Sequence, residues 1–292
     1  MTRLDPLASL TAHMQALVAA CPQSFLYVLV DGAMLSPDDP DRHVLSERGL
    51  PLMPTQAQAT PDQYWALPHL IPLTAREVGG EGLALRTSMR WASEADAASW
   101  LASSWDRSVL VAALRARLWV QIDERMGAVL RYSDARVLPV LARVLSLEQR
   151  TEFFAPLDAW WYMGRSGNIE KLDLAISSAP RPVFAEATLC LDETQQAALQ
   201  EAAEPDAVAA ILRQESPEFL QLQRADRHEF VCRSMAAAKQ WKLQSTLALA
   251  QYSLMALELG EGFAQTPQWA PLMEDVRAGR LSLAQAAERG GH

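Results

Sequence analysis

The chain has 292 residues, half of them hydrophobic, so it can bury a substantial core and is not an intrinsically disordered protein. Its 26 basic residues are outnumbered by 35 acidic ones, and no basic cluster appears in the sequence, which argues against a nucleic acid partner. Cys21, Cys190 and Cys232 are odd in number and far apart, which excludes a disulfide framework and favours buried thiols in a reducing compartment.

The first elements are a helix and a strand. Apolar residues recur on one face of Pro6 to Ala20, which predicts a helix. Phe25 to Val30 is a continuous apolar run, typical of a central strand buried on both faces, and Asp31 and Gly32 end it. Trp65 to Leu73 contains two prolines and therefore fits an edge strand at best.

A strand and two helices are predicted next. Leu83 to Ser88 has the composition of a short strand. Ser93 is predicted to begin a helix that reaches Trp100 and Leu101, because acidic residues in a first turn suit the helix dipole. Asp106 to Trp119 reads as a second helix, and the following basic residues are expected on its solvated face: Arg107, Arg115 and Arg117.

The stretch from Trp119 to Trp161 is the most ordered part of the sequence. Two β-prone runs, Leu118 to Ile122 and Ala128 to Tyr132, predict a hairpin, with Gly127 supplying a positive φ in the turn. Ser133 and Asp134 are candidate caps for a helix whose regular part begins near Leu138 because of Pro139. Ser146 followed by Gln149 predicts a capping box and another short helix.

A second hairpin is predicted over Asp158 to Met163 and Ile169 to Leu174. Its first strand carries three adjacent aromatic residues, Trp160, Trp161 and Tyr162. Because successive side chains of a strand point to opposite faces, we expect at least one of these rings to face solvent. An exposed large ring is a common anchor at protein interfaces.

The predicted fold class is α+β. Residues 1–180 are expected to form an α/β lobe with a mixed sheet and flanking helices, and Pro180 and Pro182 mark a linker. Residues 181–292 are expected to form an all-helical lobe. Its predicted helices are Asp192 to Glu204, Asp206 to Glu215, Asp226 to Gln240, Ser245 to Leu259, Trp269 to Ala278 and a short one from Ser282.

No catalytic constellation is visible in the sequence. The five histidines lack metal-ligand spacing, and His228-Glu229 lacks the second histidine of a zinc protease helix. No nucleophile elbow occurs, and paired carboxylates such as Asp38-Asp39 and Asp123-Glu124 fall in predicted turns, where solvation is the expected state. We therefore expect neither an enzyme, nor a cofactor, nor a metal site.

One set of motifs resembles the signature of a bacterial family of type VI secretion effector adaptors. It consists of Leu130 to Leu138, the Gln-Arg and Phe-Phe that follow, and then Trp160-Trp161. That family usually shows Arg-aromatic-aromatic-Asp-Pro-Arg, whereas this chain has Ser133 and Ala135 at the third and fifth places. Two further stretches agree with the resemblance: Tyr27 to Ala33, and Leu259 to Phe263 with Trp269.

The resemblance implies an adaptor chaperone, encoded between a VgrG spike protein and a toxic effector, that loads the effector onto the spike. The implied partners are a toxin effector and a VgrG-type spike, with no nucleic acid and no membrane. A cytoplasmic location is expected, because the segment Met1 to Pro6 has an acid and a proline where a signal peptide would be apolar. Two alternatives stay open: a cytosolic immunity protein that inhibits a toxin, and an unrecognised hydrolase or transferase.

Six residues are candidates for partner binding. Arg131, Trp160 and Trp161 are the expected interface anchors, the alternative being that all three serve the lobe's own core and hairpin. Arg136 would oppose the dipole of a helix capped by Asp134, so we expect an ion pair with Asp31 or Asp134, or a partner contact. Asp31 is either a functional carboxylate or an ordinary turn residue.

Overall fold

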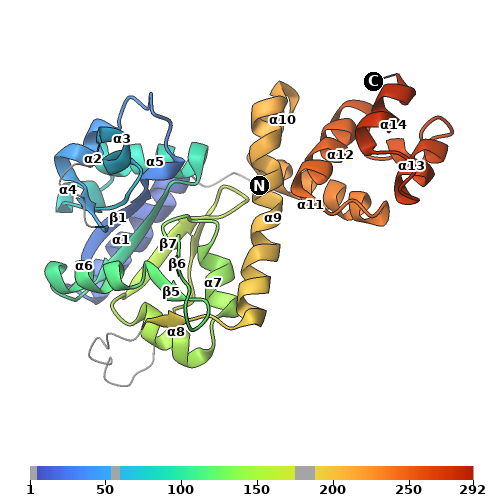
Figure 1. The fold of residues 1–292 in the computed structure, drawn as a ribbon. Coiled ribbons are helices and arrows are strands. Elements are labelled where there is room, and N and C mark those ends of the chain that lie inside the picture. The colour runs from blue at the N-terminus through green and yellow to red at the C-terminus, as the bar shows by residue number, and fades with distance from the viewer. Residues whose placement is uncertain (1–4, 54–59, 175–187, 292) are drawn as a thin grey trace. The chain divides into compact units, whose positions relative to one another are not determined.

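The computed structural model of the chain describes residues 5–53, 60–174 and 188–291. It divides into two compact units, Met1–Leu199 and Gln200–His292, and each is described here by itself. The first unit combines sheets with helices and the second is helical, which confirms the α+β class (Figure 1).

The division lies within helix α9 (Glu193–Glu215), later in the chain than the expected boundary at residue 180, which falls outside the described residues. The beginning of α9 packs on the first unit. Gln195 Nε2 donates to the Val144 carbonyl at 2.8 Å, and Leu199 contacts the core. The two helices predicted around Pro205 are one helix with that proline inside it.

The larger sheet has six strands in the order β2-β3-β1-β4-β7-β8, and every neighbouring pair is antiparallel. A smaller sheet, β6-β5-β9, contains both an antiparallel and a parallel pair. The strands are β1 (Phe25–Asp31), β2 (Leu50–Pro51), β3 (Pro68–Pro72), β4 (Ala98–Ser103), β5 (Trp119–Gln121), β6 (Gly127–Val129), β7 (Ala159–Met163), β8 (Ile169–Lys171) and β9 (Leu189–Cys190).

Helices surround the sheets in the first unit and make up the second. Those of the first unit are α1 (Pro6–Ala20), η1 (Gly32–Met34), α2 (His43–Arg48), α3 (Pro61–Trp65), α4 (Ala75–Val78), α5 (Leu83–Ala95), α6 (Arg107–Ala116), α7 (Leu138–Val144) and α8 (Leu147–Phe154). After α9 follow α10 (Pro217–Gln221), α11 (Arg224–Gln240), α12 (Thr246–Leu259), η2 (Phe263–Gln265), α13 (Ala270–Arg277) and α14 (Leu283–Gly290).

Both faces of the larger sheet are buried. One face packs against α1 and α5, and the other against α6, α7, α8 and the smaller sheet. Side chains of β1 alternate between the two cores: Val28 belongs to the first and Leu29 to the second. This explains the continuous apolar run of β1 and confirms the predicted central strand.

Two neighbouring predictions are wrong. Leu83 to Ser88 is the beginning of α5, whose buried residues recur at helical spacing, and Trp100 and Leu101 lie in strand β4 instead of a helix. Asp96 adopts a left-handed conformation (φ 56°) and ends α5, so the acidic residues assigned to a first helical turn belong to a last one. Small residues make up much of β4, which explains its weak strand signal.

Strand β3 is not at the edge, because the two-residue β2 pairs with its outer side. Its prolines stand at its two ends, where a missing amide donor disturbs the ladder least. The hairpin β5-β6 is confirmed, but Gly127 lies in β6 without a positive φ. The turn is instead closed by the Asp123 carboxylate, which accepts the amides of Arg125 and Met126.

Arg117 is buried, which contradicts its assignment to a solvated face. Its guanidinium donates to the carbonyls of Ala113, Glu152 and Phe153, in the last turns of α6 and α8. Helix C-termini carry partial negative charge, so they stabilise a cation. Burial nevertheless lowers the pKa of Arg117 to about 10.

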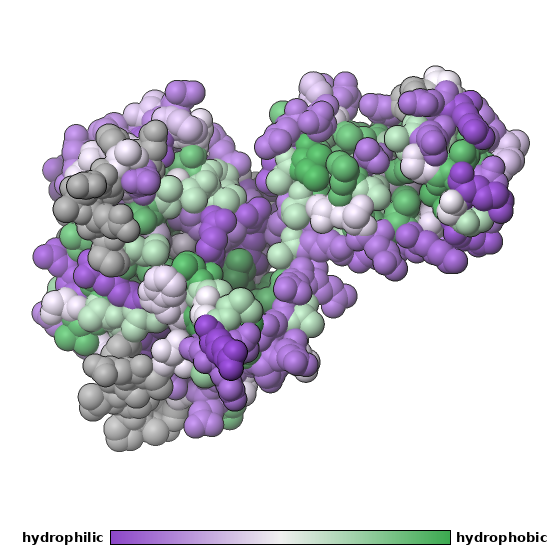
Figure 2. Space-filling model, in the orientation of Figure 1, coloured by the Kyte–Doolittle hydropathy of each residue, from purple (hydrophilic) through white to green (hydrophobic). Residues whose placement is uncertain are grey.

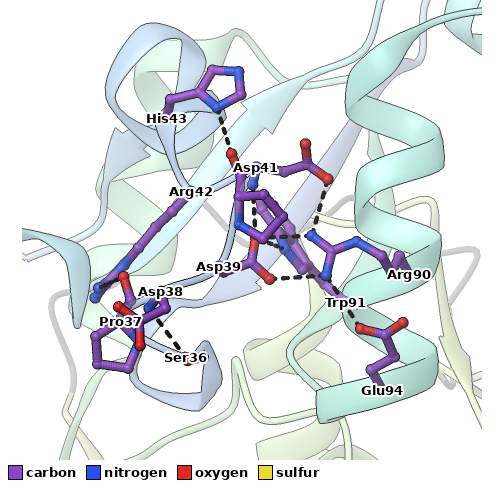
Figure 3. A network of polar contacts seen from close by, with 11 residues as sticks. Ser36, Pro37, Asp38, Asp39, Asp41, Arg42, His43, Arg90, Trp91 and Glu94 are labelled. Atoms are coloured by element: carbon purple, nitrogen blue, oxygen red, sulfur yellow. Dashed lines mark hydrogen bonds and ion pairs between the residues drawn. The ribbon is translucent and has the colours of Figure 1, made fainter.

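The loop before α2 is held on α5 by the polar network in Figure 3. Arg90 donates to both oxygens of Asp39, at 2.8 and 2.9 Å, and to Asp41 at 2.9 Å. Trp91 Nε1 donates to the same Asp39 carboxylate at 3.1 Å. Solvation was expected for the Asp38-Asp39 pair, but the Asp39 side chain is buried and bonded. The bidentate contact of Arg90 with Asp39 thus orders the loop before α2, which has no regular secondary structure of its own.

His69 of β3 is fully buried. Its Nδ1 lies 2.8 Å from the Leu67 carbonyl, and Nε2 has no hydrogen-bond partner within the part of the chain that is described. Burial disfavours the charged ring and lowers the pKa of His69 to about 4, although the Leu67 carbonyl acts in the opposite direction.

We expect His69 to make the first unit sensitive to acid. Since its folded pKa is below the ordinary value of about 6.5, the unfolded chain binds the proton more readily, and stability falls as the pH drops from about 6.5 to 4, by up to about 3 kcal/mol. Urea unfolding across this range should show the loss in the native chain and a flatter profile in His69→Phe. Identical slopes in both proteins would contradict this assignment.

Candidate partner-binding site

Asp31 ends β1, and its carboxylate accepts three hydrogen bonds. Its Oδ2 accepts from Arg131 Nη2 and from Ser133 Oγ, both at 3.0 Å, and its Oδ1 accepts the Ala33 amide at 3.2 Å. Gly32 follows because the backbone passes very close to another segment, and a Cβ there would lie 1.8 Å from the Trp65 carbonyl oxygen. The position of the Asp31 carboxylate is thus set by its hydrogen bonds and by the close backbone approach at Gly32.

The ion pair between Asp31 and Arg131 is unequally exposed. The Asp31 side chain is 3% exposed, whereas that of Arg131 is 49% exposed. Burial raises the pKa of the Asp31 carboxyl, while the charge and hydrogen bonds of Arg131 and the hydroxyl of Ser133 act in the opposite direction. The buried Asp31 carboxylate therefore positions an arginine side chain that solvent or a partner can reach.

Asp134 and Arg136 form a second, more buried pair. Arg136 donates to Asp134 through Nε at 2.9 Å and through Nη2 at 2.6 Å, and its backbone amide donates to the same carboxylate. Its Nη2 also lies 3.5 Å from Met34 Sδ, in η1. The ion pair predicted for Arg136 is confirmed, with Asp134 as the partner.

Asp134 is not the cap of α7. That helix begins at Leu138 as predicted, but Val137 occupies the N-cap position and makes no side-chain capping bond. Arg136 therefore precedes the helix and does not oppose its dipole in the first turn. The pair of Asp31 with Arg131 and the contact of Arg136 with Met34 join the end of β1 and η1 to the segment before α7, within which Asp134 and Arg136 pair with each other. Four of the six candidate residues are thus brought together: Asp31, Arg131, Asp134 and Arg136.

The replacement Asp134→Ala is expected to destabilise the first unit by about 3 kcal/mol, because it leaves the largely enclosed Arg136 guanidinium without its carboxylate. The double variant Asp134→Ala/Arg136→Met should recover part of that loss, since it removes the charge together with its partner. The measurement is a double-mutant cycle by denaturant unfolding. Additive effects of the two replacements would show that the pair contributes no coupling.

The remaining two candidates, Trp160 and Trp161, are core residues on opposite faces of β7. Trp160 donates from Nε1 to Ser99 Oγ at 3.0 Å and meets the Tyr132 and Phe154 rings edge to face. Trp161 packs in the other core, and Tyr162 is buried as well. The expectation of an outward ring is wrong because the sheet is covered on both faces, so neither tryptophan is accessible to a partner in this structure.

Trp160→Ala and Trp161→Ala should each cost about 3 to 5 kcal/mol of stability, as large core truncations do. Trp119→Ala is the matched control, because it removes the same side chain from a position that is 51% exposed, and it should cost much less. The measurement is the denaturant midpoint of unfolding of each of the three variants, compared with that of the native chain. A cost for Trp119→Ala equal to that for Trp160→Ala would contradict the burial argument.

The comparison with known proteins bears on the segment that carries both ion pairs. Residues 26–152 match the family model described as a domain of unknown function, DUF4123. That domain is known in type VI secretion effector adaptor proteins. The match includes Asp31, Arg131, Asp134 and Arg136 and ends before the two tryptophans. No curated protein and no solved structure matches the chain.

The DUF4123 segment also exposes an aromatic ring that the sequence analysis did not select. Trp119 of β5 lies opposite Val129 of β6, and both side chains are exposed, by 51% and 44%. Met126, immediately before β6, is exposed as well. The signal was present in the alternation of the strand, because Leu118 and Val120 point into the core and Trp119 must then point outward.

On the face shown in Figure 2, hydrophilic residues cover much of each unit, and hydrophobic residues gather in smaller areas on each of them. Cys190 and Cys232 are exposed and Cys21 is partly exposed, so the expected burial of the thiols is wrong. The described residues contain no group of three or more metal-binding side chains. Nor does any helix among them have the length and apolar character needed to cross a membrane.

Proposed function

We propose that this protein is a cytoplasmic adaptor chaperone that binds a toxin effector and helps to load it onto a VgrG-type spike of the type VI secretion system. The observation that carries the proposal is the DUF4123 match over residues 26–152, a domain known in such adaptors. The protein acts by binding, without a cofactor and without turning over a substrate.

The exposed residues of the DUF4123 segment suit a binding role. Protein interfaces depend on a few aromatic and arginine anchors, and the segment exposes the ring of Trp119 and the guanidinium of Arg131. Arg131 is held by the buried Asp31 carboxylate, so less conformational entropy is lost when a partner binds it. Asp31 acts in this proposal as a positioning residue for Arg131.

The test is co-purification of the chain with the effector and with the spike protein encoded beside it. The native chain should bind both. Arg131→Ala and Trp119→Ala should each weaken effector binding by about 30-fold, the equivalent of about 2 kcal/mol, while the variants stay folded. Arg86→Ala is the matched control, because Arg86 is an exposed arginine on α5 that belongs to neither ion pair.

Three outcomes would overturn the proposal. A native chain that binds neither the effector nor the spike is not an adaptor. A chain that binds the toxin and abolishes its activity, without binding the spike, is an immunity protein. Turnover of a small molecule by the purified chain alone would make it a hydrolase or transferase.

A further inference from the structure

A thiol and an imidazole lie side by side on α11. Cys232 follows His228 by four residues, so the helix places both side chains on one face. Cys232 Sγ is 3.5 Å from His228 Nε2. The thiol is exposed and the ring is partly exposed, so an ion can reach both from solvent.

The separation fits one metal ion bound by both atoms. Zinc binds cysteine sulfur at about 2.3 Å and histidine nitrogen at about 2.0 to 2.1 Å, and at a tetrahedral angle these bonds place sulfur and nitrogen about 3.5 Å apart. We propose that His228 and Cys232 form a two-ligand site for Zn²⁺ or a similar thiophilic divalent cation. The ion replaces the proton of the thiol, which is released to solvent.

Water completes the coordination. Glu229, beside His228, has its carboxylate 2.6 Å from Arg233 Nη1, and Arg233 also pairs with Glu261. Since no third ligand joins the pair in the part of the chain that is described, the ion is exchangeable and is not a requirement for folding. Sequence reasoning missed the pair because it searched for the three or four ligands of closed zinc sites.

The chain supplies its own controls. Cys190 is also exposed, but its Sγ contacts the Thr188 carbonyl at 3.6 Å. His43 is an exposed histidine whose Nδ1 lies 3.1 Å from the Pro40 carbonyl. Each shares the residue type of one proposed ligand and lacks the chelating geometry.

The experiment is titration of the whole chain with Zn²⁺, followed by calorimetry, and with Co²⁺, followed by the absorption band of a cobalt-bound thiolate. We expect one ion per chain. Cys232→Ser and His228→Gln should each weaken zinc affinity at least tenfold, whereas Cys190→Ser and His43→Gln should leave it unchanged. The thiolate band should appear in the native chain and in Cys190→Ser and be absent in Cys232→Ser.

An unchanged zinc affinity in Cys232→Ser, or a cobalt titration of the native chain without a thiolate band, would show that the two side chains share only a hydrogen bond. The result is independent of the adaptor proposal, because no effector or spike takes part in the titration. Circular dichroism of each variant without metal verifies that α11 is intact.

Discussion

The larger sheet is buried on both faces, and the rest of the first unit depends on this constraint. Each strand must supply apolar side chains in both directions, which β1 does with alternating residues and β7 with Trp160 and Trp161. The same constraint removes these rings from the surface. The large side chains that stay exposed in this unit include Arg131, which follows β6, and Trp119 on the smaller sheet, and the adaptor proposal depends on these two.

One ion pair, Asp31 with Arg131, connects the sheet to the segment before α7, and a second, Asp134 with Arg136, lies within that segment. Charges are costly to bury unless they are paired and hydrogen-bonded, and both carboxylates here accept several donors. The Asp134 side chain is 7% exposed and that of Arg136 13%, so their pair contributes to the local fold. The pair of Asp31 and Arg131 differs because its arginine stays half exposed. The two pairs thus differ in exposure, since one is almost enclosed and the other leaves its arginine accessible from solvent.

The two proposals, partner binding and metal binding, concern different units of the chain. The first contains the DUF4123 segment, with the exposed ring and arginine on which the adaptor proposal depends. The second consists of helices, and its α11 places His228 and Cys232 at a distance suited to a metal ion. Arg117 and His69 are buried ionisable groups with local structural roles, in contact with backbone carbonyls.

Local sequence determined the elements whose signals are local. The sequence predicted the helix α1, the strand β1 and the capping box of α8, because caps and apolar periodicity act over a few residues. For Arg136 it left open an ion pair with Asp31 or with Asp134, or a partner contact, and the structure shows the pair with Asp134. The tertiary structure alone decided the rest. Whether Trp160 is exposed depends on helices packed over β7, and the state of Arg117 depends on carbonyls of a helix that follows it by more than thirty residues in the chain. These contacts are set by how distant elements pack, and no pattern within a short window encodes them.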